Sequence, residues 1–151
     1  MVLPLRLSPI AMLAVAFAVG GCSAPVPHAA APDAALTQPE RWELVELMGK
    51  PIDARTGQSP WMRFESKGSR VHGFSGCNRF SGTYELEPGN RIRFSRVAAT
   101  QMACPDVGVE MDFHRAVSGA DSFNVNGEDL ALHRARMAPL ARFKATMGKT
   151  D

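Results

Sequence analysis

The stretch Tyr84-Glu85-Leu86-Glu87-Pro88-Gly89-Asn90-Arg91-Ile92-Arg93-Phe94 decides the fold, because it predicts a β-hairpin with a single favourable register. With Pro88-Gly89-Asn90 as the loop, one face of the hairpin is wholly apolar and the other carries acids opposite arginines. The expected pairs are Tyr84 with Phe94, Leu86 with Ile92, Glu85 with Arg93 and Glu87 with Arg91. A slip of one residue would place charges in the core, so the register is expected to be firmly set.

The same hairpin bears on a cluster of basic residues at Arg91, Arg93 and Arg96. Two of the three arginines are expected to have acidic partners across the hairpin. We therefore interpret the cluster as a solvated strand face rather than as a basic binding patch.

Short apolar stretches separated by Gly, Pro, Asn and Ser surround this hairpin, which is typical of antiparallel strands. Further strands are expected at 42–47, 61–64, 70–74 and 138–143. A second hairpin is expected over 122–133, where Asn126-Gly127 suggests a two-residue turn. That register would set Val125 against Glu128, so we prefer a four-residue loop over 126–129. The longer loop aligns Phe123 with Leu132 and Val125 with Leu130.

One good helical pattern lies between the hairpins, over residues 109–120. At about 100° per residue, five apolar side chains fall within one narrow sector. These are Val109, Phe113, Ala116, Val117 and Ala120. Asp106 or a neighbour is expected to cap the start of the helix, and Gly119 is expected to end it.

The N-terminal residues 1–21 predict a lipoprotein signal peptide. Residues 10–19 form an unbroken apolar run, which is shorter than the roughly 20 residues that a permanent membrane helix needs. The sequence Val19-Gly20-Gly21-Cys22 resembles a lipobox, so Cys22 is expected to carry the lipid. The alternative is an ordinary secretory signal with an incidental cysteine. Ser23 follows the cysteine where an Asp would favour inner-membrane retention, which indicates the outer membrane, facing the periplasm.

Residues 22–39 are expected to hold the lipidated cysteine and an Ala/Pro-rich tether. Positions 23–39 contain four prolines and six alanines, with Asp33 as the only formal charge. Such a segment buries too little apolar surface to offset its ordering entropy, so an extended, semi-rigid tether is predicted. A single folded domain is then expected over 40–147.

Composition excludes one class of partner. Without residues 1–21 the chain has 16 basic and 15 acidic residues, a net charge of +1. A balance this close to neutral gives no electrostatic reason to expect nucleic acid.

The order of several short motifs resembles the META domain, also called the HslJ-like family. The matching residues are Gly76-Cys77-Asn78, Phe80, Gly82, Tyr84, the strand at 92–94, Thr100, Met102-Ala103-Cys104, Glu110 and Phe113 in the helix, Leu130, Leu132 and Phe143. Trp42 and Leu44 extend the resemblance to about residues 40–145. It implies a mainly β domain with one packed helix (α+β), small, antiparallel and barrel-like. For bacterial members it also implies association with heat shock and novobiocin tolerance, without an established enzymatic activity.

Cys77 and Cys104 are interpreted as a disulfide, because disulfides form readily outside the cytoplasm. The alternative is a metal site, but His72, His114 and His133 fall at no recognisable zinc spacing. We expect no metal and no cofactor.

Two other polar groups have two interpretations each. The Glu110 and His114 pair, four residues apart, is interpreted as solvated rather than as half of a metal site. Asn78 is interpreted as a turn residue that tolerates a left-handed conformation. Its alternative role is in a recognition surface with Arg79 and Thr100. The motif residues predicted to shape this turn are Gly76, Asn78, Phe80, Gly82, Thr100 and Met102.

No catalytic residues are expected, since the sequence has no nucleophile elbow, phosphate loop or dinucleotide fingerprint. We expect a non-enzymatic envelope lipoprotein that is held to the membrane through Cys22. Its expected role is to support heat and antibiotic tolerance through contacts with an envelope protein or an apolar ligand. The alternative is a small-barrel module whose interior carries a lipid or another hydrophobic molecule.

Overall fold

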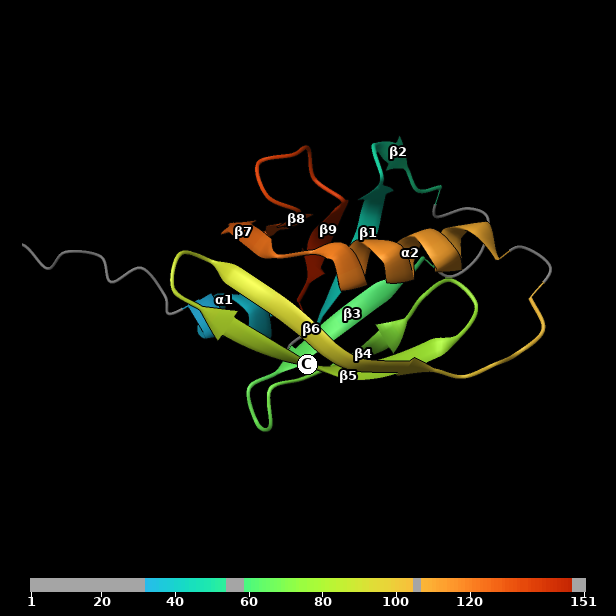
Figure 1. Ribbon diagram of the computed structural model, residues 1–151, viewed down its shortest axis with the longest axis horizontal. Helices are drawn as coiled ribbons and strands as arrows, with labels where there is room; N and C mark the ends of the chain where they lie inside the picture. The colour runs from blue at the N-terminus through green and yellow to red at the C-terminus, as the bar shows by residue number, and fades with distance from the viewer. Residues whose placement is uncertain (1–31, 54–58, 105–106, 148–151) are drawn as a thin grey trace, which may run out of the picture.

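The computed structural model describes residues 32–53, 59–104 and 107–147. Within these ranges two helices accompany nine strands (Figure 1). The helices are α1 (Pro32–Thr37) and α2 (Gly108–Gly119). The strands are β1 (Arg41–Leu47), β2 (Lys50–Pro51), β3 (Trp61–Glu65), β4 (Arg70–Phe74), β5 (Arg79–Glu87), β6 (Arg91–Ala99), β7 (Ser122–Asn126), β8 (Asp129–His133) and β9 (Ala141–Thr146).

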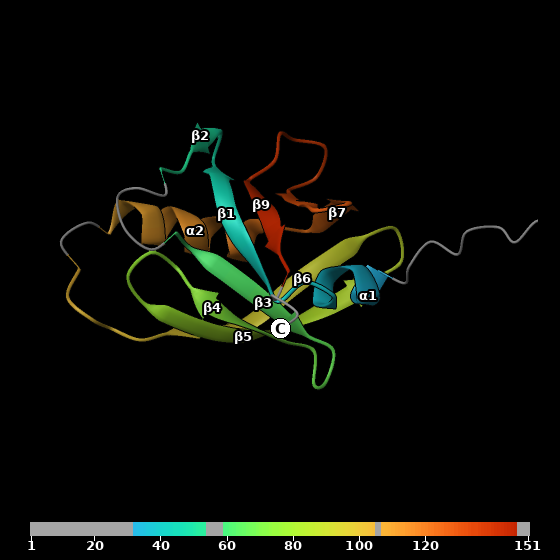
Figure 2. The ribbon, with the colours of Figure 1, turned by 180° about the vertical axis from the view of Figure 1, so that it is seen from behind.

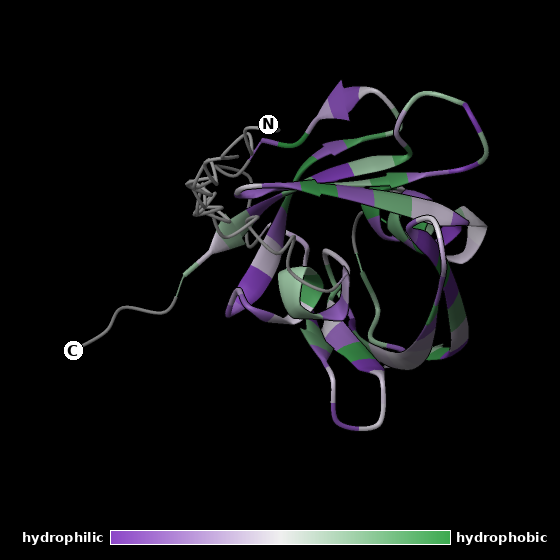
Figure 3. Ribbon diagram, turned by 90° about the vertical axis from the view of Figure 1, so that its left-hand side faces the viewer, coloured by the Kyte–Doolittle hydropathy of each residue, from purple (hydrophilic) through white to green (hydrophobic). Residues whose placement is uncertain are grey.

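The sheet closes into a ring. Strand β1 pairs with β3 on one side and with β9 on the other, while β2 adds a short flap on β1. All these pairings are antiparallel, and in the view from behind β1 and β9 lie side by side (Figure 2). Hydrophobic and hydrophilic residues alternate along the strands, as the period of two requires for a sheet with one buried face (Figure 3). The expected mainly β, barrel-like domain with a packed helix is confirmed.

The ring has one weak seam, between β6 and β7. Among the described residues these strands share a single ladder pair, Arg91 with Ser122. Helix α2 follows β6 and precedes β7 in the chain, and it lies across the ring at this place (Figure 1). Its buried face, which includes Phe113, Ala116 and Val117, therefore supplies core contacts where the strand ladder is thin.

The register of the first hairpin is confirmed at all four expected pairs, from Tyr84 with Phe94 to Glu87 with Arg91. The expected ion pairs are wrong, however. Arg93 pairs diagonally with Glu87, at 3.7 Å between Nη2 and Oε1. Within the described residues, Glu85 forms no ion pair with Arg93, and Glu87 forms none with Arg91. The long arginine side chain reaches the diagonal neighbour as readily as the opposite one.

The second hairpin also has the predicted register, with Phe123 opposite Leu132 and Val125 opposite Leu130. Its loop is shorter than expected. Asn126 pairs with Asp129, so the ladder continues one step further and the turn consists of Gly127 and Glu128. Gly127 has φ of +60°, which a glycine adopts without steric cost.

The helix prediction is confirmed, and Gly119 is its last residue. The proposed cap Asp106 lies outside the described residues. The last strand is β9 over Ala141–Thr146 rather than 138–143. Pro139 has no backbone N–H for a ladder, whereas the pairing of β9 with β1 continues to Thr146 opposite Arg41.

The N-terminal boundary also differs from the expectation. The last part of the expected tether forms α1 and packs on the domain, with Leu36 fully buried. Two hydrogen bonds that are at least partly buried hold it. Trp42 Nε1 donates to the Leu36 carbonyl oxygen at 2.8 Å, and the Tyr84 hydroxyl donates to Asp33 Oδ1 at 2.6 Å. The burial of Leu36 and these two hydrogen bonds order a segment whose composition indicated no ordered structure. Residues 1–31, including Cys22, lie outside the described residues.

Tyr84 allows a test of this docking. Burial of the side chain, and then its bond to Asp33, raise the pKa of Tyr84 well above its usual range. Tyr84→Phe removes only the hydroxyl, and we expect it to lower the free energy of unfolding by about 1 to 3 kcal/mol, as for a hydrogen bond to a charged acceptor. Urea denaturation would measure the loss. Asp33→Asn, which keeps an acceptor oxygen, is the control and should cost less. Equal stability of Tyr84→Phe and the wild type would show that α1 does not depend on this bond.

Large side chains occupy the interior of the ring. Trp42, Phe64, Phe113 and Phe143 are each at most 2% exposed, and Phe113 lies 6.4 Å from Phe143 between ring centroids. No helix within the described residues is long and apolar enough to span a membrane.

Candidate functional site

The turn between β4 and β5 carries the motif residues. It runs from Ser75 to Asn78, and Gly76 has φ of +114°. Asn78 lies in this turn as expected, but it is not among the described residues with positive φ, so it does not adopt the left-handed conformation. Gly76 takes that role, because a residue without a Cβ adopts this conformation at least cost.

The side chain of Asn78 instead joins three segments. It is 5% exposed, and its Oδ1 accepts hydrogen bonds from Thr100 Oγ1 and from the backbone N–H of Met102, each at 2.8 Å. Its Nδ2 donates to Glu110 Oε2 at 3.1 Å. Because an amide offers both donor and acceptor groups, Asn78 can connect the 100–104 segment to helix α2. These bonds are internal, so Asn78 does not serve as a surface recognition group.

Glu110 is the central acid of this network. Its side chain is 12% exposed, and Oε1 accepts from Ser75 Oγ at 3.0 Å. His114 Nε2 lies 3.7 Å from the same oxygen. The interpretation of Glu110 and His114 as a solvated pair is therefore wrong for the acid. The i, i+4 spacing was visible in the sequence, but the burial depends on the 75–78 turn packing against α2, which no local pattern encodes.

Ser75 has the geometry of a structural residue. It is fully buried, and its hydroxyl also lies 2.9 Å from the Asn78 carbonyl oxygen. A hydroxyl enclosed in this way is out of reach of a substrate.

Cys77 and Cys104 form a disulfide, with their Cα atoms 6.2 Å apart. The bond joins the 75–78 turn to the 100–104 segment, next to the bonds made by Asn78. Both sulfurs and a Glu110 oxygen lie within 4.8 Å of one another. While the sulfurs are bonded to each other, neither is a thiolate available to a metal.

The other motif residues lie at different places. Phe80 packs under the network against Phe113, with ring centroids 5.2 Å apart. Gly82 lies where β5 meets β6, and a Cβ there would come within 3.0 Å of the Ser95 carbonyl oxygen. Met102 contributes its backbone, while its side chain is 62% exposed. The structure thus unites Gly76, Asn78, Thr100 and Met102, and adds Ser75 and Glu110.

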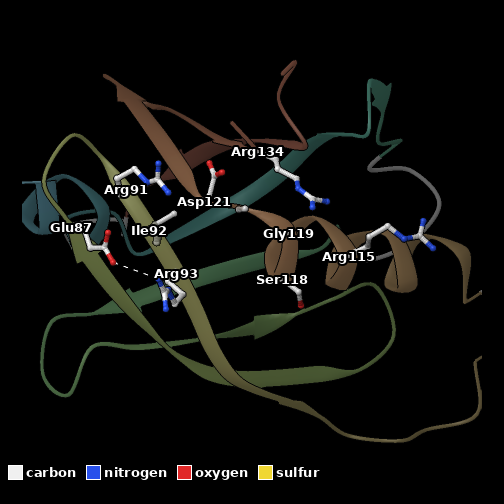
Figure 4. Close-up of a pocket in the computed structure, with 10 residues that line it drawn as sticks. Glu87, Arg91, Ile92, Arg93, Arg115, Ser118, Gly119, Asp121 and Arg134 are labelled. Atoms are coloured by element: carbon white, nitrogen blue, oxygen red, sulfur yellow. Dashed lines mark ion pairs between the residues drawn. The ribbon is translucent and has the colours of Figure 1, made fainter. Parts of the chain in front are cut away.

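A separate cleft opens over the seam between β6 and β7, with a volume of about 530 Å³. Figure 4 shows Arg91 and Arg134 on either side of Asp121. Asp121 accepts from Ser122 Oγ at 2.8 Å and from the Ala135 N–H at 2.9 Å. These bonds, and then the two arginines, hold the pKa of Asp121 below its usual value. The cleft is thus a charged surface of mixed sign. No local sequence pattern predicts it, because its residues meet only in the fold.

The fold and the positions of the motif residues agree with a match to a known protein family. The sequence profile of the META domain matches residues 34–147. The chain belongs to the META domain family. The match begins inside α1, in agreement with the packing of this helix on the domain. No curated protein matches the chain.

Solved structures show the same fold for this META domain. A protein from Burkholderia xenovorans, solved by NMR, is 24% identical with a TM-score of 0.61, and the match covers 84% of this chain and 96% of that one. A DUF4847 family protein from Bacteroides vulgatus is 15% identical with a TM-score of 0.55, covering 78% and 99%. At these identities the likeness concerns the fold alone.

Proposed function

We propose that this META domain protein is a non-enzymatic, lipid-anchored protein of the cell envelope that supports tolerance of heat and antibiotics through contacts with envelope proteins. Family membership suggests a stress-related domain without enzymatic activity. The observation that carries the proposal is that the polar side chains of the motif bond within the domain. The polar side chains of Ser75, Asn78 and Glu110 form hydrogen bonds with one another, so they support the fold rather than bind a substrate.

The choice of partner rests on the interior and the surface. The ring is filled by Trp42, Phe64, Phe113 and Phe143, which favours a scaffold over a carrier of apolar ligands. The cleft with Arg91, Asp121 and Arg134 offers charged groups of both signs, which suits a polar protein surface better than a lipid chain.

The anchor is proposed from Val19-Gly20-Gly21-Cys22 and the apolar run before it. Several acyl chains on Cys22 would hold the protein to the membrane, since each buried methylene contributes about 0.8 kcal/mol. The absence of Asp after the cysteine favours the outer membrane, with the domain in the periplasm.

A deletion strain of the native host tests the role. We expect the strain to survive heat and novobiocin less well than its parent, and the wild-type gene to restore survival. The Cys22→Ser gene should restore it poorly, because this variant has the same domain but no anchor. Intact mass spectrometry of the protein from native membranes should show acyl groups on Cys22. Unimpaired survival of the deletion strain would contradict the stress role, and an unmodified Cys22 would contradict the anchor.

The carrier alternative has its own test. Native mass spectrometry of the protein extracted from its membrane would reveal a bound lipid as an added mass. We expect the mass of the acylated protein without a further ligand, because large aromatic side chains occupy the interior of the ring.

A further inference from the structure

The surroundings of the disulfide contain a mostly buried carboxylate and, one helical turn away, a buried imidazole nitrogen without a hydrogen-bond partner among the described residues. The side chain of Glu110 is mostly buried, and among the described residues its carboxylate forms no ion pair with a lysine or arginine. His114 Nε2 is buried and has no hydrogen-bond partner among the described residues. The carboxylate accepts hydrogen bonds from Ser75 and Asn78, whereas a buried imidazole nitrogen without a partner is costly unless something binds it.

The distances around these groups suit a metal ion. In a tetrahedral zinc site, bonds of about 2.0 to 2.3 Å place the ligand atoms roughly 3.3 to 3.8 Å apart. Cys104 Sγ lies 3.7 Å from Glu110 Oε2, and His114 Nε2 lies 3.7 Å from Glu110 Oε1. The Cys77 and Cys104 sulfurs and the Glu110 oxygen all fall within 4.8 Å of one another. His114 is outside this group of three and faces it from the next turn of α2.

The carboxylate is also held in place as a metal ligand usually is. Ser75 Oγ contacts Oε1 and Asn78 Nδ2 donates to Oε2, so both oxygens are oriented by neighbouring side chains. Hydrogen bonds of this kind fix the direction of ligating carboxylates in metal sites. Phe80 and Phe113 pack against the ring of His114 and limit its movement.

We propose that reduction of the Cys77–Cys104 disulfide creates a site for one zinc ion, with Cys77, Cys104 and Glu110 as ligands and His114 as the fourth. A dithiol reductant supplies the two electrons and becomes a disulfide itself, while each cysteine sulfur takes up a proton. Zinc then displaces both thiol protons and binds the two thiolates. A disulfide oxidant then takes two electrons from the thiolates and becomes a dithiol with two protons from water, so the Cys77–Cys104 bond forms again and the ion loses two ligands and is released.

The ligand chemistry favours zinc or another thiophilic ion over magnesium or calcium. Two thiolates, one imidazole and one carboxylate match the soft and borderline donors that zinc selects, whereas magnesium and calcium require oxygen ligands. The site and the disulfide exclude each other, so the metal marks the reduced protein only. This inference is independent of the envelope role.

The test uses the full chain with Cys22→Ser, so that only two thiols are present. The disulfide is reduced with a phosphine, whose oxidation takes its oxygen from water and leaves no competing thiol. The reduced protein is titrated with Zn²⁺ against a chromogenic chelator, and with Co²⁺ to detect the thiolate charge-transfer band. We expect one ion per chain after reduction and none before it.

Paired variants assign the ligands. Glu110→Gln and His114→Ala should each weaken binding at least about tenfold. The matched controls are Glu65→Gln and His72→Ala, a partly exposed pair with His72 Nδ1 3.6 Å from Glu65 Oε1, and they should leave the affinity unchanged. Equal weakening by both pairs, or the absence of binding by the reduced chain, would overturn the proposal.

The zinc site can also be tested if the domain unfolds on reduction. Circular dichroism in the near ultraviolet reports the packing of Trp42 and Trp61. If the reduced chain is unfolded without metal, zinc should refold it, because binding to a site that exists only in the folded state stabilises that state. A reduced chain that stays unfolded and binds no zinc would refute the site.

Discussion

Replacing Cys77 and Cys104 together by serine is expected to lower the free energy of unfolding by about 3.5 kcal/mol. The bond joins residues 27 positions apart. Closing a loop of this length lowers the conformational entropy of the unfolded chain, which stabilises the folded state by about 3.5 kcal/mol. For a domain whose net stability is of the order of 5 to 15 kcal/mol, this is a large share. The melting temperature should fall by more than about 10 °C.

Guanidinium denaturation of the wild type and the double variant, both carrying Cys22→Ser, would measure the difference in the presence of a metal chelator. Chemical reduction of the wild type should reproduce the loss. As a check on the bond itself, thiol alkylation of the unfolded, non-reduced protein should label neither Cys77 nor Cys104. Labelling of both would show that the bond is absent, and an unchanged stability would show that it does not restrain the unfolded chain.

The parts of the fold that the sequence predicted are those with a repeating local pattern. The hairpin at Tyr84–Phe94 was predictable because every alternate residue is apolar, so a single register satisfies both faces. The helix was predictable because Phe113, Ala116 and Val117 recur at the helical period. Helix α1 was not predictable in this way, because it offers a single fully buried side chain, Leu36, and one of its contacts joins Asp33 to Tyr84, 51 positions away in sequence.

The same distinction applies to the site. The resemblance to the META domain identified the motif residues, but it did not give their roles. Asn between glycines predicts the turn in which Asn78 lies, but not the bonds of its side chain to residues 22 to 32 positions away. Arg93 was assigned to the opposite acid, since the register does not say which rotamer a long side chain selects. Polar networks between distant segments are set by packing, and a single sequence carries little information about them.

The strongest expected effect on this network comes from a single atom change, Asn78→Asp. The new carboxylate keeps the oxygen that accepts from Thr100 and Met102, but it places an oxygen where Nδ2 now donates to Glu110 at 3.1 Å. Two carboxylates at this distance cannot both be ionised in a buried place, so one of them takes a proton. Keeping a group with an ordinary pKa near 4 protonated at pH 7 costs about 4 kcal/mol, and we expect the stability to fall by up to this amount.

The pH dependence identifies the cause. The folded variant holds a proton that the unfolded chain has lost at neutral pH, so its stability should decrease as the pH rises and recover as the pH falls. Between about pH 7 and pH 4 the deficit relative to the wild type should shrink by about 1.4 kcal/mol per pH unit. Asn78→Ala is the control. It leaves polar groups without partners and should cost about 2 to 3 kcal/mol, with no such slope.

A second substitution should reverse the effect. In the double variant Asn78→Asp with Glu110→Gln, the amide and the carboxylate exchange places, so a donor again faces an acceptor and one negative charge remains. We expect most of the lost stability to return at pH 7, as measured by urea denaturation across the pH range. A deficit of Asn78→Asp that does not vary with pH, or that Glu110→Gln does not relieve, would show that Glu110 does not lie against Asn78. Recovery in the double variant would establish that this buried contact joins the 75–78 turn to helix α2 in solution.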